Sequence, residues 1–145
     1  TCSFIFQMLK LYVLVYKGEP LDYHEYRHTA LYLKLPDNQS FIMHILGTQG
    51  MFEYAQIKNK DPSVVGSLAK VVPVADISEV IGSGPIQSTV AKTLVQNGPL
   101  DLDWNCQHWV GDALSKLAER KYITVAERAE AIDRMMDACL EAMDD

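Results

Sequence analysis

The chain has 145 residues, which predicts one domain, residues 1–145, large enough to bury a sizeable apolar core. Its 13 basic and 19 acidic side chains give a net charge of −6, which argues against a nucleic-acid partner and against binding to an anionic membrane surface. Three cysteines, Cys2, Cys106 and Cys139, are too few and too scattered for a disulfide framework. We therefore expect a reducing, cytoplasmic location.

The first apolar segment, residues 2–16, resembles a signal peptide in composition. However, Gln7 and Lys10 interrupt it, and no small-residue cleavage site follows. The segment is also too short and too broken to cross a bilayer, so we predict a strand here.

Five segments have the β-branched, aromatic and apolar composition of strands: residues 11–17, 28–35, 41–46, 51–58 and 69–77. Residues 36–39 and 47–50 have turn chemistry and separate the second, third and fourth segments. Pro73, inside the fifth segment, predicts an edge position or a bulge because proline has no N–H to donate.

Three helical patterns follow the strands. The first covers residues 85–96, with Ile86, Val90 and Leu94 on one face and a Gly-Pro stop after Asn97. The second begins near Asn105 and has the apolar stripe Trp109, Val110, Ala113, Leu114 and Leu117. The third begins with a capping box, Thr124 to Glu127, and has the apolar face Ile132, Met135, Met136, Cys139, Leu140 and Met143. This order predicts an α+β fold, with an antiparallel sheet of about five strands followed by three helices.

Cys106 carries the most chemical information, because it follows Asn105, a good helix N-cap residue. In the first turn of a helix, unpaired N–H groups and the positive end of the helix dipole favour the reactive thiolate. The backbone N–H of Cys106 can also hold the oxyanion of a tetrahedral intermediate. The residues alone leave open a second interpretation, a small core cysteine packed beside Trp109 and Val110.

A nucleophilic thiol needs a base within hydrogen-bond reach. His108 is two residues from Cys106 on the same helix and points elsewhere, so we expect it to pack or cap locally. His24 lies in a loop segment without geometric support. His28 and His44 lie on neighbouring predicted strands, although each alone is also compatible with a structural histidine.

Three blocks of sequence occur in a distinctive order: His28-Thr29-Ala30-Leu31-Tyr32-Leu33, then Phe41-Ile42-Met43-His44, then Asn105-Cys106-Gln107-His108-Trp109-Val110. In this order they resemble the lecithin:retinol acyltransferase-like proteins, which belong to the circularly permuted NlpC/P60 branch of papain-like thiol enzymes. The resemblance covers roughly residues 10–120.

The resemblance implies a single permuted papain-like domain that carries out thiol-dependent acyl transfer. No His, Cys or carboxylate set has the spacing of zinc ligands, and we expect neither a metal nor a cofactor. Cys106 would be the nucleophile, His28 its general base and acid, and His44 the group that orients His28. Asn105 would cap the helix, and the N–H of Cys106 would serve the oxyanion. An acyl-bearing small molecule, lipid or peptide would pass its acyl group through a thioester on Cys106 to water, an amine or an alcohol.

Several positions depart from the family pattern without removing a proposed catalytic group. Gln107 replaces an acidic residue, Trp109 replaces Phe, and Thr29 replaces an aromatic residue. The family's hydrophobic C-terminal anchor is absent and residues 141–145 are acidic, so we expect no stable membrane anchor.

The spacing of the two histidines conflicts with the role of His44. A four-residue turn over residues 36–39 would pair residues whose numbers sum to about 75, which places His44 opposite Leu31 or Tyr32. His44 would then lie on the other face of the sheet from His28 and about 10–13 Å along the strand. We therefore expect His44 to be structural unless a bulge or a larger loop restores proximity.

Two alternative functions remain open. A cysteine peptidase or amidase of the same fold would need an open cleft on both sides of Cys106. A non-catalytic binding module with an idle dyad is favoured if His28 faces away from Cys106.

Overall fold

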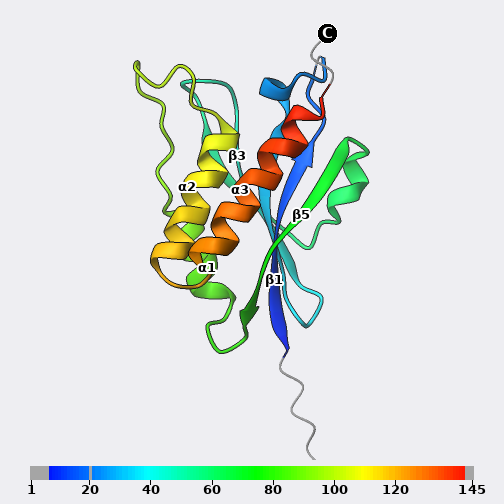
Figure 1. Ribbon diagram of the computed structural model, residues 1–145, viewed down its shortest axis with the longest axis vertical. Helices are drawn as coiled ribbons and strands as arrows, with labels where there is room; N and C mark the ends of the chain where they lie inside the picture. The colour runs from blue at the N-terminus through cyan, green and yellow to red at the C-terminus, as the bar shows by residue number, and fades with distance from the viewer. Residues whose placement is uncertain (1–6, 20, 143–145) are drawn as a thin grey trace, which may run out of the picture.

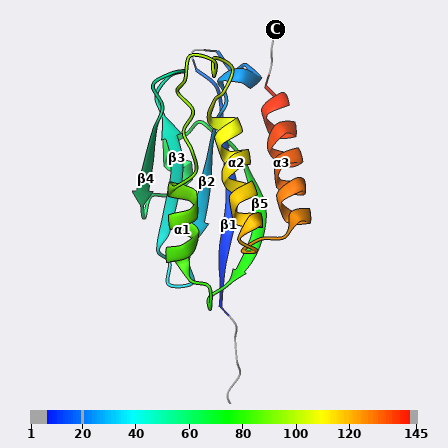
Figure 2. The ribbon, with the colours of Figure 1, turned by 90° about the vertical axis from the view of Figure 1, so that its left-hand side faces the viewer.

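One antiparallel sheet and three helices make up the fold. The computed structural model describes residues 7–19 and 21–142, so that Cys2 and Met143 lie outside the described residues. Five strands form the sheet and the three helices follow them in the chain. The helices pack together on one side of the sheet, and the short 3₁₀ segment η2 (Pro62–Val65) lies on the other side (Figures 1 and 2). The predicted α+β fold class is therefore confirmed.

The strands are β1 (Met8–Tyr16), β2 (His28–Lys34), β3 (Ser40–Leu46), β4 (Glu53–Lys58) and β5 (Leu68–Ser78). Their order across the sheet is β4-β3-β2-β1-β5, so β4 and β5 are its edges. Pro73 lies in the edge strand β5, where the pairing register with β1 shifts between Leu11 and Tyr12. This position confirms the prediction that Pro73, which has no N–H to donate, lies in an edge strand or at a bulge.

The helices are α1 (Ser83–Ala91), α2 (Cys106–Glu119) and α3 (Val125–Leu140), and the 3₁₀ segment η1 (His24–Tyr26) precedes β2. The predicted capping box of α3 is present, since the Glu127 N–H donates to Thr124 Oγ1 at 3.0 Å and the Thr124 N–H donates to Glu127 Oε1 at 2.8 Å. Side chains alternate between the two faces of the sheet. The face under the helices holds the main core, which includes Leu11, Val13, Leu31, Leu33, Met43, Trp109, Leu114 and Leu117.

The opposite face of the sheet carries a smaller apolar cluster of Leu14, Tyr16, Ala30 and Ile42. Tyr32, Ile57 and Leu68 pack against this cluster and are only partly buried. This helix-free face is therefore apolar near its centre and accessible at its margins.

The first helix is shorter than predicted. It ends at Ala91 rather than at residue 96, and Leu94, expected on the buried face, is 70% exposed. The Thr93 N–H donates to the carbonyl of Val90, and the Thr93 carbonyl accepts a hydrogen bond from the indole of Trp109 at 3.4 Å. Since that carbonyl is bonded to α2, it does not continue the helical ladder of α1.

Two residues of the predicted apolar face of α3 are also exposed, Met136 (40%) and Leu140 (61%). Met135 and Cys139 are buried, as predicted, and Ala131 and Ala138 complete the buried stripe. Hydrophobicity alone does not predict that Ala131 and Ala138 are buried while Met136 and Leu140 are exposed.

The β2–β3 hairpin has a shorter loop than the sequence analysis assumed. The Leu35 N–H donates to the Gln39 carbonyl at 2.8 Å, which leaves residues 36–38 as the loop. Asn38 has φ 70°, the left-handed conformation that ends many three-residue hairpin loops. Paired residue numbers therefore sum to 74, as in Leu31–Met43 and Leu33–Phe41. Because this sum is even, His28 and His44 lie on the same face of the sheet. The prediction that they lie on opposite faces is therefore wrong.

No helix in the described part of the chain is long and apolar enough to cross a membrane.

Gly47 is required by the turn between β3 and β4. Its φ is +114°, and a Cβ built there would lie 2.5 Å from the carbonyl oxygen of Met51. We predict that Gly47→Ala lowers the free energy of unfolding by about 2 kcal/mol or more, because strain and backbone overlap add. Gly84→Ala is the control, because a Cβ there meets nothing within 4 Å. Urea denaturation should show no loss for that variant; equal losses for both would contradict the assignment.

Candidate functional site

Cys106 is the first residue of α2, as predicted, and Asn105 is its N-cap. The Asn105 side-chain oxygen accepts from the N–H groups of Gln107 at 2.9 Å and His108 at 3.4 Å. His108 completes a capping box, since its Nδ1 accepts from the Asn105 N–H at 3.2 Å. The expectation that His108 caps locally is therefore confirmed, and the thiol lies in the first turn of a well-capped helix.

The thiol lies where the pairing between β2 and β3 stops. The last paired residues are Leu31 and Met43, although β2 begins three residues earlier at His28. Because Leu35 bonds toward β3 and backbone direction alternates along a strand, Thr29 and Arg27 also point toward β3. Cys106 Sγ donates to the Arg27 carbonyl at 3.8 Å, and the Thr29 N–H faces the same sulfur. The thiol thus takes the position that a strand partner of β2 would occupy.

Gln107 anchors the start of α2 to the chain segment before β2. Its side-chain amide donates to the carbonyls of His24 at 2.8 Å and Arg27 at 3.1 Å, and the residue is 8% exposed. In the sequence, Gln107 stands out only as a departure from an acidic residue of the family pattern. An amide suits this position because both of its neighbours are acceptors, which a carboxylate would repel.

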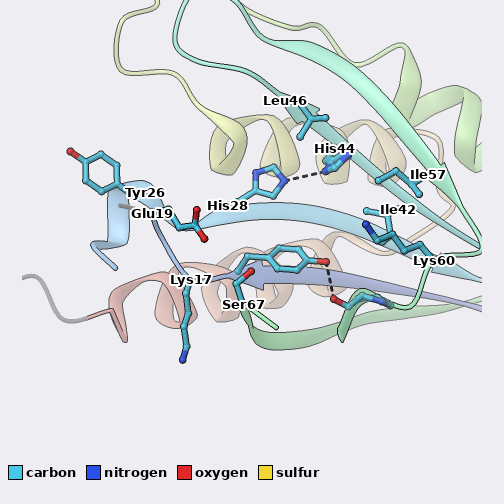
Figure 3. Close-up of a pocket in the computed structure, with 12 residues that line it drawn as sticks. Lys17, Glu19, Tyr26, His28, Ile42, His44, Leu46, Ile57, Lys60 and Ser67 are labelled. Atoms are coloured by element: carbon cyan, nitrogen blue, oxygen red, sulfur yellow. Dashed lines mark hydrogen bonds between the residues drawn. The ribbon is translucent and has the colours of Figure 1, made fainter. Parts of the chain in front are cut away.

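The two strand histidines are brought together. His28 Nε2 and His44 Nδ1 are 3.1 Å apart, and the ring centroids are 5.3 Å apart (Figure 3). They form a diagonal pair on the helix-free face, where Tyr16 also lies 5.9 Å from the His28 ring. The hairpin register accounts for this contact without a bulge.

Cys106 and His28 are neighbours that are not bonded to each other in this arrangement. The Cys106 thiol bonds the carbonyl of the residue before His28, whereas the His28 ring bonds His44. Both residues line one cavity of about 690 Å³, together with Arg27, Asn105 and the loop after β3. Cys106 and His28 therefore share one cavity at the opening between β2 and β3.

Burial sets the charge state of all three groups. Burial, and then the neighbouring His44, lowers the pKa of His28 to about 4. Burial, and then Lys60, lowers the pKa of His44. Burial raises the pKa of the Cys106 thiol, although the backbone N–H groups of Thr29, Cys106 and Gln107 partly oppose this. At neutral pH the site therefore contains neutral imidazoles and a protonated thiol.

Two buried polar atoms of the site have no hydrogen-bond partner in the described part of the chain, Thr29 Oγ1 and His44 Nε2. The Thr29 hydroxyl faces the thiol and favours its ionised form. Thr29 is therefore a site residue that the sequence analysis noted only as a departure from an aromatic residue.

Arg27 fixes the end of β2 against α3. Its guanidinium makes two bonds to Asp22, at 2.9 and 2.8 Å, and donates to the carbonyl of Ala138 at 2.8 Å. The side chain of Arg27 is only 6% exposed, and that of Asp22 is 32% exposed. Hydrogen bonds from Arg27 hold the pKa of Asp22 at about 2.

A second cavity, of about 320 Å³, lies on the helix-free face beside the two histidines (Figure 3). Its apolar wall includes Ile42, Leu46 and Ile57, and Lys60 lies at its margin. No sequence motif marks this cavity, because its lining comes from four strands and two loops. Within residues 7–19 and 21–142, no three His, Cys, Asp or Glu side chains cluster in a way that could hold a metal ion.

The chain belongs to a family of unknown function (DUF6540), whose family model matches residues 11–124. The match covers most of β1, the other four strands, α1 and α2, and therefore includes His28, His44 and Cys106. Neither a curated protein nor a solved structure matches the chain.

We predict that Arg27→Met lowers the free energy of unfolding by about 1–3 kcal/mol, because it leaves Asp22 and the Ala138 carbonyl without their buried partner. Lys10→Met is the matched control, since it removes an exposed ion pair to Asp76 and should cost less than about 0.5 kcal/mol. Guanidinium denaturation of both variants tests this. A loss for Arg27→Met no larger than that of the control would show that Arg27 does not hold β2 to α3.

The pKa of His28 gives stability a predictable pH dependence. The unfolded chain takes up a proton near pH 6.5, whereas folded His28 does so only near pH 4. Stability should therefore fall as the pH drops from about 6.5 to about 4, by up to about 3 kcal/mol. His28→Gln should reduce this slope, and Tyr16→Phe, which keeps the ring contact and the histidine, should retain it. Urea titrations at pH 7.5, 6.5 and 5.5 measure the slopes, and an unchanged slope in His28→Gln would contradict the prediction.

Proposed function

We propose that the protein is a cysteine-dependent acyl hydrolase or acyltransferase built on a circularly permuted papain-like domain. In this proposal Cys106 is the nucleophile, His28 is the general base and acid, and His44 orients His28. The observation that carries the proposal is the hydrogen bond between His28 Nε2 and His44 Nδ1, on the strand whose end contacts the Cys106 sulfur. The order of the three residues along the chain and the helix cap at Asn105 support it.

The histidine pair defines the direction of proton transfer. If His28 Nε2–H donates to His44 Nδ1, then His28 Nδ1 is unprotonated and can accept the proton of the thiol. This requires the His28 ring to turn toward the opening between β2 and β3, where the thiol lies. Since the thiol and the imidazoles are neutral at rest, the base removes the proton as the sulfur attacks, rather than before the substrate binds.

The reaction then follows the general course of thiol acyl transfer. The sulfur attacks the substrate carbonyl, the thiol proton moves to His28 Nδ1, and the oxyanion accepts from the N–H of Cys106. Collapse of the intermediate expels the leaving group, which takes the proton from His28, and leaves a thioester on Cys106. Water, an amine or an alcohol then attacks the thioester, gives its proton to His28, and releases the acyl product as the thiol regains that proton.

A binding module with an idle dyad is the second candidate. It is supported by the thiol bond to the Arg27 carbonyl and by the position of the His28 ring on the helix-free face. A peptidase or amidase would use the same thioester chemistry, so the test must include both ester and peptide substrates.

The test is acylation of Cys106, followed by acid quenching and intact mass measurement. The substrates are p-nitrophenyl hexanoate and a panel of peptidyl aminomethylcoumarins, used with a Cys2→Ser background. We predict that Cys106→Ala abolishes the acyl adduct and that His28→Gln slows its formation by at least about 100-fold. Cys139→Ala is the control, because that thiol is 1% exposed and should contribute nothing.

An ester adduct without peptide cleavage supports the acyl hydrolase or transferase, and peptide cleavage supports the peptidase. If no substrate acylates Cys106, or if His28→Gln reacts as fast as the parent protein, the enzyme proposal is wrong. Circular dichroism of each variant separates loss of reaction from loss of fold.

A further inference from the structure

The cavity of about 320 Å³ on the helix-free face is separate from the cavity that contains the thiol. Three residues, Tyr26, His28 and Leu46, line both spaces, so the His28 ring lies between them. Cys106 lines only the larger space. A molecule in the smaller cavity would therefore contact the histidine pair from the side opposite the thiol.

His44 has an unmet hydrogen-bonding requirement in this region. The residue is 7% exposed, and its Nδ1 is bonded to His28. Its Nε2 is buried and has no hydrogen-bond partner in the described part of the chain. Buried polar atoms rarely remain unpaired, since each such atom loses its bonds to water.

The tautomers of the two rings determine what kind of group Nε2 needs. When His28 Nε2–H donates to His44 Nδ1, a neutral His44 must carry its own proton on Nε2. Nε2 is then a donor, and the missing partner is an acceptor. That tautomer of His28 is also the one that leaves Nδ1 free to accept the thiol proton.

The surroundings of the cavity indicate which acceptor would bind. Ile42, Leu46 and Ile57 form an apolar wall, and the Lys60 side chain extends toward the rings beside Ile42 (Figure 3). Lys60 is close enough to act electrostatically on His44. The carboxylate next to it in the chain, Asp61, is occupied by the N–H of Ser63 at 2.9 Å and its hydroxyl at 2.7 Å.

We propose that this cavity binds a small carboxylate with an apolar body, its carboxylate placed between the Lys60 ammonium and the Nε2–H of His44. The apolar body would lie against Ile42, Leu46 and Ile57. Glu19 lines the same cavity next to Tyr26 and His28 (Figure 3), so a ligand charged at both ends with two carboxylates would be disfavoured. The volume is at the lower end of the range for small-molecule sites, which favours a body of roughly six to eight carbons.

The bound carboxylate would also act on the thiol. By accepting from His44 Nε2 it would hold both rings in the tautomer that frees His28 Nδ1. This consequence rests on the proposed function, whereas binding itself does not.

The binding test uses sodium octanoate as the probe and isothermal titration calorimetry as the measurement. We expect octanoate to bind, and the uncharged octanamide to bind at least tenfold more weakly. Lys60→Met should weaken octanoate binding at least tenfold. Lys58→Met is the matched control, because Lys58 lies beside Phe41 on the opposite face of β4, and it should change the affinity less than twofold.

Failure of octanoate to bind at millimolar concentration would overturn the proposal. Equal binding of octanoate and octanamide, or unchanged binding by Lys60→Met, would also overturn it. Imidazole ¹⁵N spectra give a second readout, in which saturating octanoate should place the His44 proton on Nε2. Spectra that show no change in the His44 nitrogens would contradict the assigned contact.

The same probe separates this inference from the proposed function. Cys106→Ser should bind octanoate as tightly as the parent protein, because the thiol lies outside the cavity. In the parent protein, octanoate should accelerate alkylation of Cys106 by iodoacetamide severalfold, and Lys60→Met should lose this effect. Binding without acceleration would support the site and overturn its link to the thiol.

Discussion

Arg27 makes the contacts on which the rest of the site depends. Its carbonyl accepts from the Cys106 thiol and from the Gln107 amide, so it fixes the first turn of α2 against β2. Its guanidinium bonds Asp22 and the carbonyl of Ala138, so it also fixes the loop after β1 and the end of α3. A buried guanidinium is costly unless its donors are paired, and here three hydrogen bonds join Arg27 to Asp22 and Ala138, which lie far apart in the chain. The position of the thiol therefore depends on the packing of three elements around one residue.

Local chemistry was enough to predict the elements, but not the relations between them. The five strands, the caps at Asn105 and Thr124, and the edge position of Pro73 follow from residue types that act on their own neighbours. The length of α1 depended instead on Trp109, whose indole N–H donates to the carbonyl of Thr93, 16 residues earlier in the sequence and just beyond the end of α1. The contact of His28 with His44 depended on whether the β2–β3 loop has three or four residues. A change of one residue in that loop moves the side chains of β3 to the opposite face of the sheet relative to those of β2.

The candidate site was predictable only where a residue's position depends on its neighbours in the sequence. Cys106 could be placed at a helix start because Asn105 precedes it, whereas the role of Thr29 required the knowledge that β3 separates from β2. The cavity beside the histidines was not predictable, since its walls come from residues that share no motif. The low pKa of His28 has the same origin, because burial is a property of the assembled sheet and not of the sequence block.

The early end of the β2–β3 pairing also bears on how the chain folds. The three-residue turn after Leu35 closes over a short distance in sequence, so pairing can begin at that end and extend to Leu31 and Met43. Beyond that point the neighbour of β2 is α2, which is more than 70 residues away in the chain. We therefore expect the end of the hairpin that carries the histidines to be completed only when the helical layer docks, so that the geometry of the site forms late in folding, after much of the sheet.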